Sequence, residues 1–170
     1  HGKGTLTENV GGQYEGYQQN LKHIGLWKNG KSIKGKSIYE DGTKYVGDWM
    51  DENLAHGKGK LTYPNGGQFI GSFYKDDPKV GKGIIYFDHS KYVGEMKTKE
   101  GRLNLDGKGV ETLKNGDKIE GVWKNGRPIK VSKYVFYGPD DTKWEYEGEV
   151  TTKGELLPNG KGVLKIINSK

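Results

Sequence analysis

A glycine and aromatic pattern that recurs along the chain is the feature that most constrains its fold. The full pattern begins on a Gly-x-Gly pair and has a further Gly nine residues on, an aromatic residue or Ile twelve on, a Gly fourteen on and a Trp or Phe sixteen on, and three repeats fill all four of these later slots. The repeat that starts at Gly57 fills these slots with Gly66, Phe69, Gly71 and Phe73. Seven repeats start near Gly2, Ile33, Gly57, Gly81, Gly107, Ile129 and Gly160. The spacing between successive starts is typical of stacked repeats.

The repeat predicts a β-hairpin. Residues 61–73 (LTYPNGGQFIGSF) read as two short alternating strands joined at Asn65-Gly66, where a tight hairpin turn requires a positive φ. The same turn signal recurs at Asp41-Gly42 and at Asn115-Gly116. An isolated hairpin is marginally stable in water, so we expect successive hairpins to stack on one another.

The second strand of each hairpin predicts how the stacking works. Phe69, Gly71 and Phe73 are two residues apart and therefore share one face of the strand. Two rings thus flank a patch of bare backbone at the glycine, and we expect that patch to receive a ring from a neighbouring repeat. Glycine is predicted to be an architectural residue here.

Composition agrees with a thin-cored β structure. Only 31% of the 170 residues are hydrophobic and 29 are Gly, but Pro is limited to 5 and no three-residue period is present, which excludes collagen. The 4 Trp, 11 Tyr and 4 Phe are too many for a disordered chain. We therefore expect an all-β fold, an open, twisted, elongated stack of antiparallel β-hairpins with about six to seven units.

Three segments resemble the MORN repeat (membrane occupation and recognition nexus). The sequence pattern of this repeat is Tyr-x-Gly-x-Trp-x-Asn-Gly followed by His-Gly-x-Gly. It is matched closely by residues 45–66 (YVGDWMDENLAHGKGKLTYPNG) and 1–16 (HGKGTLTENVGGQYEG), and its first half is matched by residues 119–126 (IEGVWKNG). The resemblance implies a stack of hairpins in an open, rod-like sheet. It also implies that the structural repeat positions are Gly2, Gly4, Tyr14, Gly16, Trp27, Tyr45, Gly47, Trp49, Gly57, Gly59, Phe69, Gly71, Phe73, Gly81, Gly83, Tyr92, Gly94, Gly107, Gly109, Gly121, Trp123, Tyr146 and Gly148.

The array is expected to form a single domain over residues 1–170, with local irregularities. A second candidate strand at residues 23–27 leaves open whether the first repeat holds an insertion or two half-repeats, and whether residues 17–24 form a strand or a loop. The repeat from Gly81 has Met96 in its Trp slot and a long link after it, which predicts a bulge or bend. The repeat from Ile129 has Val131 in its second glycine slot. Because the chain opens in mid-pattern, we expect it to be an excerpt of a longer protein.

Motifs that carry chemistry are weak. Residues 25–32 (GLWKNGKS) and 30–37 (GKSIKGKS) match the phosphate-binding loop pattern, but turn signals follow where a helix should open. None of the four His has ligand spacing, and the paired carboxylates at 76–77 and 140–141 lie beside Pro in turns. The net charge of +6 is spread along the chain. We expect no catalytic residue, no metal, no cofactor and no nucleic-acid partner.

Two functions remain open. The first is a non-catalytic scaffold that binds a protein partner or a second copy of itself, because several aromatic residues fall outside the stacking series. These are Tyr17, Tyr63, Tyr74, Tyr86, Phe87, Phe136 and Tyr137. The resemblance implies a cytoplasmic location in a cytoskeletal, ciliary or membrane-associated assembly, or an accessory segment of a larger enzyme.

The alternative is a module that binds phosphoinositides or other anionic lipids. Lysines gather in two loose clusters, and each Lys near an anionic membrane surface contributes about 1 kcal/mol. The candidate lipid-binding residues are Lys28, Lys31, Lys34, Lys36, Lys75, Lys79 and Lys82. Acidic residues interspersed among them, such as Glu40 and Asp41, favour solvated links instead.

Overall fold

The computed structural model describes residues 2–10, 19–29, 31–50, 54–138, 140–150 and 158–167, and in these ranges the regular structure is strand throughout. No helix among these residues is long and apolar enough to cross a membrane. The predicted positions Tyr14 and Gly16, together with Tyr17, lie outside the described residues. The chain divides into two compact units, His1–Gly81 (unit 1) and Lys82–Lys170 (unit 2), and each is described separately.

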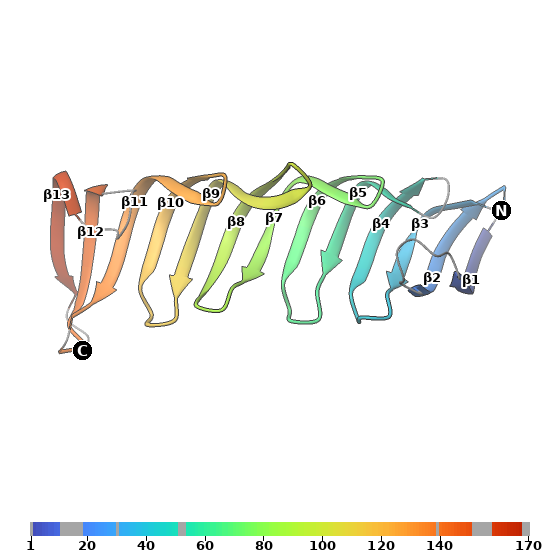
Figure 1. Cartoon of the computed structure of the whole chain (residues 1–170), viewed down its shortest axis with the longest axis horizontal. Coiled ribbons are helices and arrows are strands. Elements are labelled where there is room, and N and C mark those ends of the chain that lie inside the picture. Colours follow the sequence, from blue (N-terminus) through green and yellow to red (C-terminus); the bar gives the residue numbers. More distant parts are fainter. Residues whose placement is uncertain are drawn as a thin grey trace. The chain divides into compact units, whose positions relative to one another are not determined.

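Unit 1 is an antiparallel sheet whose strands pair with their neighbours in chain order (Figure 1). Residues 19–24, whose state the sequence left open, belong to its second strand. The strands are β1 (Gly2–Val10), β2 (Gln19–Lys28), β3 (Lys31–Ile38), β4 (Lys44–Met50), β5 (Leu54–Thr62), β6 (Gln68–Tyr74) and the first half of β7 (Asp77–Tyr86).

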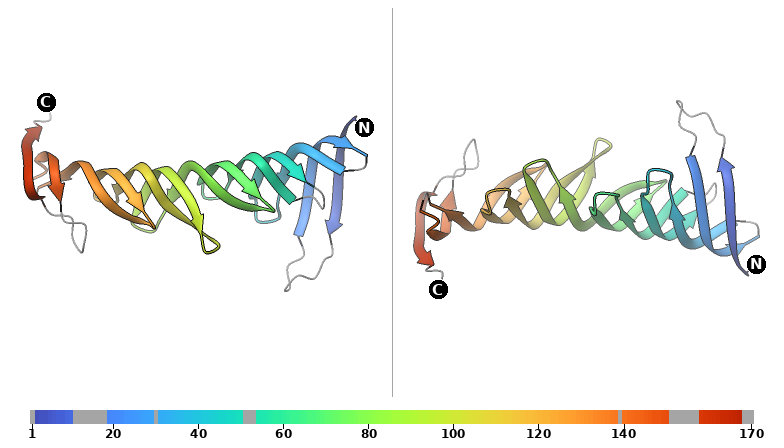
Figure 2. Two further views of the ribbon diagram at one scale, coloured as in Figure 1. Left: turned by 90° about the horizontal axis from the view of Figure 1, so that it is seen from above. Right: turned by 90° about the horizontal axis from the view of Figure 1, so that it is seen from below.

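Unit 2 repeats the same arrangement. It contains the rest of β7, then β8 (Ser90–Lys99), β9 (Arg102–Leu113), β10 (Lys118–Lys124), β11 (Arg127–Tyr137), β12 (Lys143–Val150) and β13 (Pro158–Ile167). Adjacent strands are antiparallel and joined as hairpins, and they twist strongly within each unit (Figure 2). The predicted all-β fold of stacked hairpins in an open sheet is confirmed.

A row of paired glycines crosses each sheet at right angles to the strands. In unit 1 the backbone partners are Gly25, Gly35, Gly47, Gly59 and Gly71, each opposite the next. In unit 2 the row runs through Gly94, Gly109 and Gly121. A Cβ placed on Gly47 would lie 2.6 Å from the Cα of Gly59, so this position has no room for a larger residue.

Tyrosine rings fill the space that the missing side chains leave. Tyr45 lies over Gly59 of the following strand, as the stacking predicted, and it also covers Gly47 of its own strand. The prediction that a neighbouring repeat supplies the ring over Gly47 is therefore wrong. The Tyr45 hydroxyl donates to the Asp48 carbonyl at 2.9 Å, which folds the ring back along its own strand.

The same ring-on-glycine contact recurs in unit 2. Tyr92 lies over Gly94 and Gly109, and its hydroxyl donates to the Glu95 carbonyl at 3.0 Å. Burial, followed by the charge of Glu95, raises the pKa of Tyr92 to about 12, so the hydroxyl remains a donor at physiological pH. The ring meets Trp123 edge to face at a centroid distance of 5.3 Å. These contacts form a thin core on one face of the sheet.

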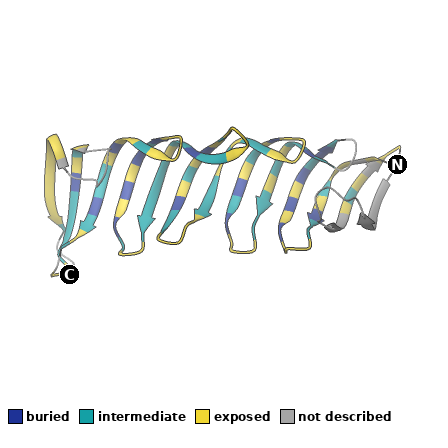
Figure 3. Ribbon diagram, viewed as in Figure 1, coloured by how far each residue is buried: buried dark blue, intermediate teal, exposed yellow. Residues whose placement is uncertain are grey.

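Burial alternates along the strands, as Figure 3 shows. In β4 the side chains of Tyr45 and Trp49 are buried, whereas that of Val46 between them is exposed. Met96 occupies the Trp slot of its repeat and is 1% exposed, so it takes the place of the ring in the core. The core face is mostly apolar, although it includes Ser37, which is fully buried opposite Tyr45, and the opposite face is open to solvent.

Two kinds of turn alternate along the chain. At Asn65-Gly66 only the glycine has a positive φ, and Tyr63 and Gly67 close a three-residue loop in which the Asn65 side chain accepts from the Gly67 amide. The prediction of a tight two-residue turn at Asn65-Gly66 is therefore wrong. Two-residue turns occur instead at the other ends of the strands, as at Asn125-Gly126, where both residues have positive φ.

The sequence predicted a bulge or bend at the long link after Met96, but the bulge lies before this link, and a regular repeat has the same register shift between Gly47 and Trp49. The register of β8 and β9 shifts between Gly94 and Met96, and the long link extends this hairpin to Lys99. The Glu95 carboxylate accepts the amide of Lys108 at 2.8 Å and so fills the bulge. Asp48 does the same in unit 1 for the amide of Lys58 at 3.0 Å.

Gly109→Ala should lower the free energy of unfolding by about 1–3 kcal/mol, because the new Cβ would enter the ring of Tyr92. Urea denaturation of the purified chain measures this cost. In a Tyr92→Ala background the same substitution should cost less than about 0.5 kcal/mol, since its clashing partner is gone. Equal costs in the two backgrounds would contradict the ring-on-glycine contact.

Asp76→Asn should stabilise the chain at neutral pH. Asp76 is exposed as a whole, but its carboxylate turns back to accept the Ala55 amide at 2.6 Å, and desolvation raises its pKa despite that bond. A raised pKa in the folded state means that stability is lost as the pH rises through that pKa. Asn keeps the acceptor, removes the charge and tolerates the positive φ at this turn.

The increase in the free energy of unfolding should be small, because solvent still screens the Asp76 carboxylate. The increase should shrink as the pH is lowered through the pKa of Asp76, because the wild-type carboxylate then also becomes neutral. Urea midpoints of the two proteins at pH 7 and at pH values down to about 3 test this. A stability difference that does not change with pH would refute the assignment.

Candidate functional site

The face of unit 1 opposite the aromatic core is the candidate site. Side chains alternate across a strand, so the residues next to each paired glycine point to the solvent face. Val46 and Ile70 lie there at 50% and 47% exposure, and Ile24 is exposed as well. Because these exposed side chains are aliphatic, the face differs from an ordinary polar surface that only contacts solvent.

The central row of this face alternates aliphatic and lysine residues. Cross-strand partners from β2 to β6 are, in order, Ile24, Lys36, Val46, Lys60 and Ile70. Each lysine therefore lies between two branched aliphatic side chains. The lysine stems extend the apolar surface while their ammonium groups stay in water.

A second row lies on the other side of the glycines. Leu26 is opposite Lys34, which is opposite Asp48, and Lys58 is opposite Ser72. We call the two rows together the basic-aliphatic face, which comprises Ile24, Leu26, Lys34, Lys36, Val46, Asp48, Lys58, Lys60, Ile70 and Ser72.

The basic-aliphatic face is positively charged. Asp48 is its single acid, and one of its oxygens is used by the Lys58 amide while the other lies 3.7 Å from the Lys34 ammonium. In the part of the chain that the structure describes, no ion pair reaches Lys36 or Lys60. Their charges are available to a partner.

The predicted lysine clusters contribute only in part. Lys34 and Lys36 belong to the basic-aliphatic face, whereas Lys28 and Lys31 pair with each other at the end of the β2–β3 hairpin. Lys75 lies in the β6–β7 turn, Lys79 forms an ion pair with Asp77 at 3.3 Å, and Lys82 belongs to unit 2.

Sequence reasoning missed Lys58 and Lys60. Both flank Gly59 in a Lys-Gly-Lys triplet, as Lys34 and Lys36 flank Gly35. The triplet was the available signal, because a residue on either side of a core-facing glycine must point to the opposite face. Grouping lysines by nearness along the chain concealed this, since the face joins residues of separate strands.

Unit 2 presents a mixed surface at the equivalent positions. Val93 is opposite Val110, which is opposite Glu120, and a second line joins Lys108, Val122 and Lys130. A shallow hollow of about 490 Å³ lies among these side chains. Glu95 and Glu120 offset the lysines at these positions, which therefore lack the net positive charge of the basic-aliphatic face.

Several of the leftover aromatic residues are exposed, as the sequence predicted: Tyr74, Tyr86, Phe87 and Tyr137. Tyr74 lies 5.3 Å from the ring of His56, and the ammonium groups of Lys75 and Lys79 are each 5.9 Å from its centroid. Phe136 instead stacks on Trp144 at 6.4 Å. These rings are dispersed and form no single platform with the basic-aliphatic face.

The weak chemical motifs occupy ordinary structural places. The described residues of the two phosphate-loop matches belong to β2, β3 and the turn between them. Asp76 binds the Ala55 amide, and Asp140 accepts from the amide and hydroxyl of Thr142 in a turn. Among the residues searched, no group of three or more His, Cys, Asp or Glu could hold a metal ion.

Comparison with known proteins identifies the repeat. The family model of the MORN repeat matches residues 45–68 and 104–118. The first match covers β4, β5 and the loop that leads into β6, and the second covers most of β9 and the turn that follows it. No curated protein matches the chain significantly. These two segments of the chain therefore match the MORN repeat, and they contain Gly47, Gly59 and Gly109 of the glycine rows and the overlying ring of Tyr45.

Proposed function

We propose that this chain is a non-catalytic binding scaffold that docks an acidic protein surface on the basic-aliphatic face of unit 1. The alternation of lysine and aliphatic side chains across five strands, from Ile24 to Ile70, is the observation that carries the proposal. MORN repeats are generally associated with protein and membrane-lipid interaction, which agrees with a binding role.

The rigidity of the opposite face supports docking. Tyr45, Trp49 and Phe73 meet edge to face at 5.0 and 4.9 Å and fix the backbone beneath the exposed residues. Side chains on a preorganised sheet lose little conformational freedom on binding. Exposed aliphatic groups supply area, and the unpaired lysines supply attraction and orientation for an acidic partner.

Self-association through this face is disfavoured. Two copies that met through it would bring Lys36 and Lys60 of one against the same lysines of the other, with Asp48 as the only acid. Like charges brought together in an interface cost several kcal/mol. A second copy of the chain would have to use another surface.

Anionic lipid is the second candidate, because the same lysines would attract phosphoinositide headgroups. Two features favour protein. Adjacent strands rotate by about 20–25°, so a flat bilayer would reach only a few strands of unit 1 at once. Interfacial membrane segments also commonly carry Trp and Phe, whereas the apolar residues here are Ile, Leu and Val. A cytoskeletal, ciliary or membrane-associated setting in the cytoplasm would supply either partner.

A photo-crosslinking residue at Val46 tests the partner class directly. In the full-length protein in its native cells, irradiation should give a protein adduct, identified by its mass. Lys36→Glu with Lys60→Glu should reduce the yield at least tenfold, because both central charges are reversed. The charge-matched control, Lys99→Glu with Lys114→Glu, changes two exposed lysines of unit 2 and should leave the yield unchanged.

Vesicle co-sedimentation supplies the opposing outcome. Salt-sensitive recruitment to phosphoinositide vesicles, lost in the Lys36 and Lys60 double variant, together with a lipid adduct at Val46, would overturn the protein-docking proposal. A crosslinked second copy of the chain would likewise contradict the expected repulsion between like faces.

A further inference from the structure

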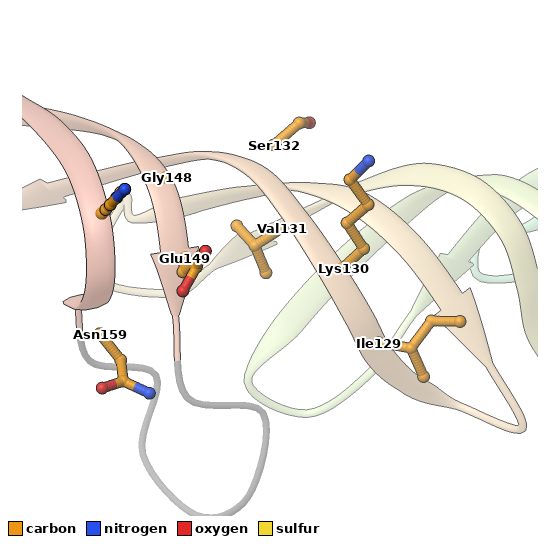
Figure 4. Close-up of a pocket in the computed structure, with 8 residues that line it drawn as sticks. Ile129, Lys130, Val131, Ser132, Gly148, Glu149 and Asn159 are labelled. Atoms are coloured by element: carbon orange, nitrogen blue, oxygen red, sulfur yellow. The ribbon is translucent and has the colours of Figure 1, made fainter.

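Strands β11 and β12 separate part of the way along their length. They are paired only from Tyr134 opposite Tyr146 to Tyr137 opposite Lys143, and the described residues form no further pair between them. Beyond this point a cavity of about 500 Å³ is lined by residues 129–132 of β11, by Gly148 and Glu149 of β12, and by Asn159 and Lys161 of β13 (Figure 4). β11 remains paired with β10, and β12 with β13, on their outer sides.

Val131 lies beside the separation. It stands opposite Gly121 in the slot that Gly94 and Gly109 fill in the preceding strands. Its side chain is 7% exposed and therefore occupies the core face, where the other repeats have a ring over bare glycine. The ring of Tyr146 lies over Gly148 and Gly162, so it joins β12 to β13 in the same way that Tyr45 and Tyr92 join their own strand to the next one.

The gap presents two strand edges. Over residues 129–133 and 147–149 the inner backbone groups have no ladder partner across the gap among the described residues. Unpaired strand edges readily accept an added strand. In Figure 4, Val131 and Glu149 come from the two facing strands.

The charge of the lining is positive. Lys130 of β11 and Lys161 of β13 line the cavity, and in the described part of the chain neither forms an ion pair. The Glu149 carboxylate lies against Gly160, where an added Cβ would collide with its Oε2, so this acid is turned toward β13. The lining also includes Ile129, which is 56% exposed.

We propose that the gap between β11 and β12 binds an extended peptide segment that inserts as a strand, with acidic side chains beside Lys130 and Lys161 and an aliphatic side chain against Val131. The volume lies within the roughly 300–1,000 Å³ of typical ligand sites. Four residues of a strand span about 13 Å. Strand addition gives affinity through backbone hydrogen bonds and specificity through alternate side chains.

Other occupants fit the gap less well. A lipid chain would leave the strand edges without hydrogen-bond partners, which is costly for buried polar groups. Nucleic acid requires more cations than Lys130 and Lys161 supply. The site lies wholly within unit 2, so this proposal can be tested independently of the one for the basic-aliphatic face of unit 1.

The probe for the test is a fluorescein-labelled peptide, acetyl-Glu-Val-Glu-Val-Glu-amide, titrated with the full chain by fluorescence polarisation. We expect saturable binding and slowed amide exchange in residues 129–133 and 147–149. A peptide of the same sequence with N-methylated backbone amides keeps its charge but cannot complete a ladder, and it should bind at least tenfold more weakly. Equal binding of the two peptides would overturn strand insertion.

Two variants locate the site. Lys130→Glu with Lys161→Glu should weaken binding at least tenfold through charge alone, whereas Lys99→Glu with Lys114→Glu should not. Val131→Gly removes the aliphatic side chain that the peptide would contact and should also weaken binding, and Val93→Gly, at an exposed valine of the same sheet, controls for the loss of a side chain. Unchanged binding in both site variants, or displacement of the peptide by an equal charge of oligonucleotide, would overturn the proposal.

Discussion

The contact between a tyrosine ring and bare glycine backbone is the interaction on which the rest of this structure depends. Tyr45 covers Gly47 and Gly59, and Tyr92 covers Gly94 and Gly109. Each ring thereby joins two strands across a position where neither strand has a side chain. A hydroxyl bond to the carbonyl three residues on, as from Tyr92 to Glu95, holds the ring flat on its own strand. A chain with few hydrophobic residues can thus build a core in a single layer, because each ring contacts backbone instead of a second layer of side chains.

The thin core has a direct consequence for function. Because all the packing lies on one face, the other face is left open, and its character is decided by the residues beside the glycines. In unit 1 these residues are lysines and branched aliphatics, as with Lys36, Val46 and Lys60. In unit 2 Glu120 and Glu95 break the pattern. The same fold therefore carries two different surfaces, and the strand pairing is irregular beside Val131, which stands in a glycine slot.

Much of the fold followed from local chemistry. The period-two spacing of Phe69, Gly71 and Phe73 and the Asn-Gly signals sufficed for hairpins, strand order and the identity of the core residues. The turn at Asn65-Gly66 was harder, since the same dipeptide serves both a two-residue turn and the longer loop found here, and the Asn side chain decides between them through its bond to Gly67. The candidate face was only half predicted. Lys34 and Lys36 were found, but Lys58 and Lys60 belong to another strand and were missed.

The sequence by itself determined the repeat, its all-β character and which residues face the core, because periodicity along one strand is a local property. Only the tertiary structure decided which strands lie beside one another in register, and hence that Ile24, Lys36, Val46, Lys60 and Ile70 form one continuous row. It alone showed that Tyr45 folds back over its own strand and that β12 parts from β11 beside Val131. These features depend on backbones coming within contact distance, and spacing along the chain does not specify that distance.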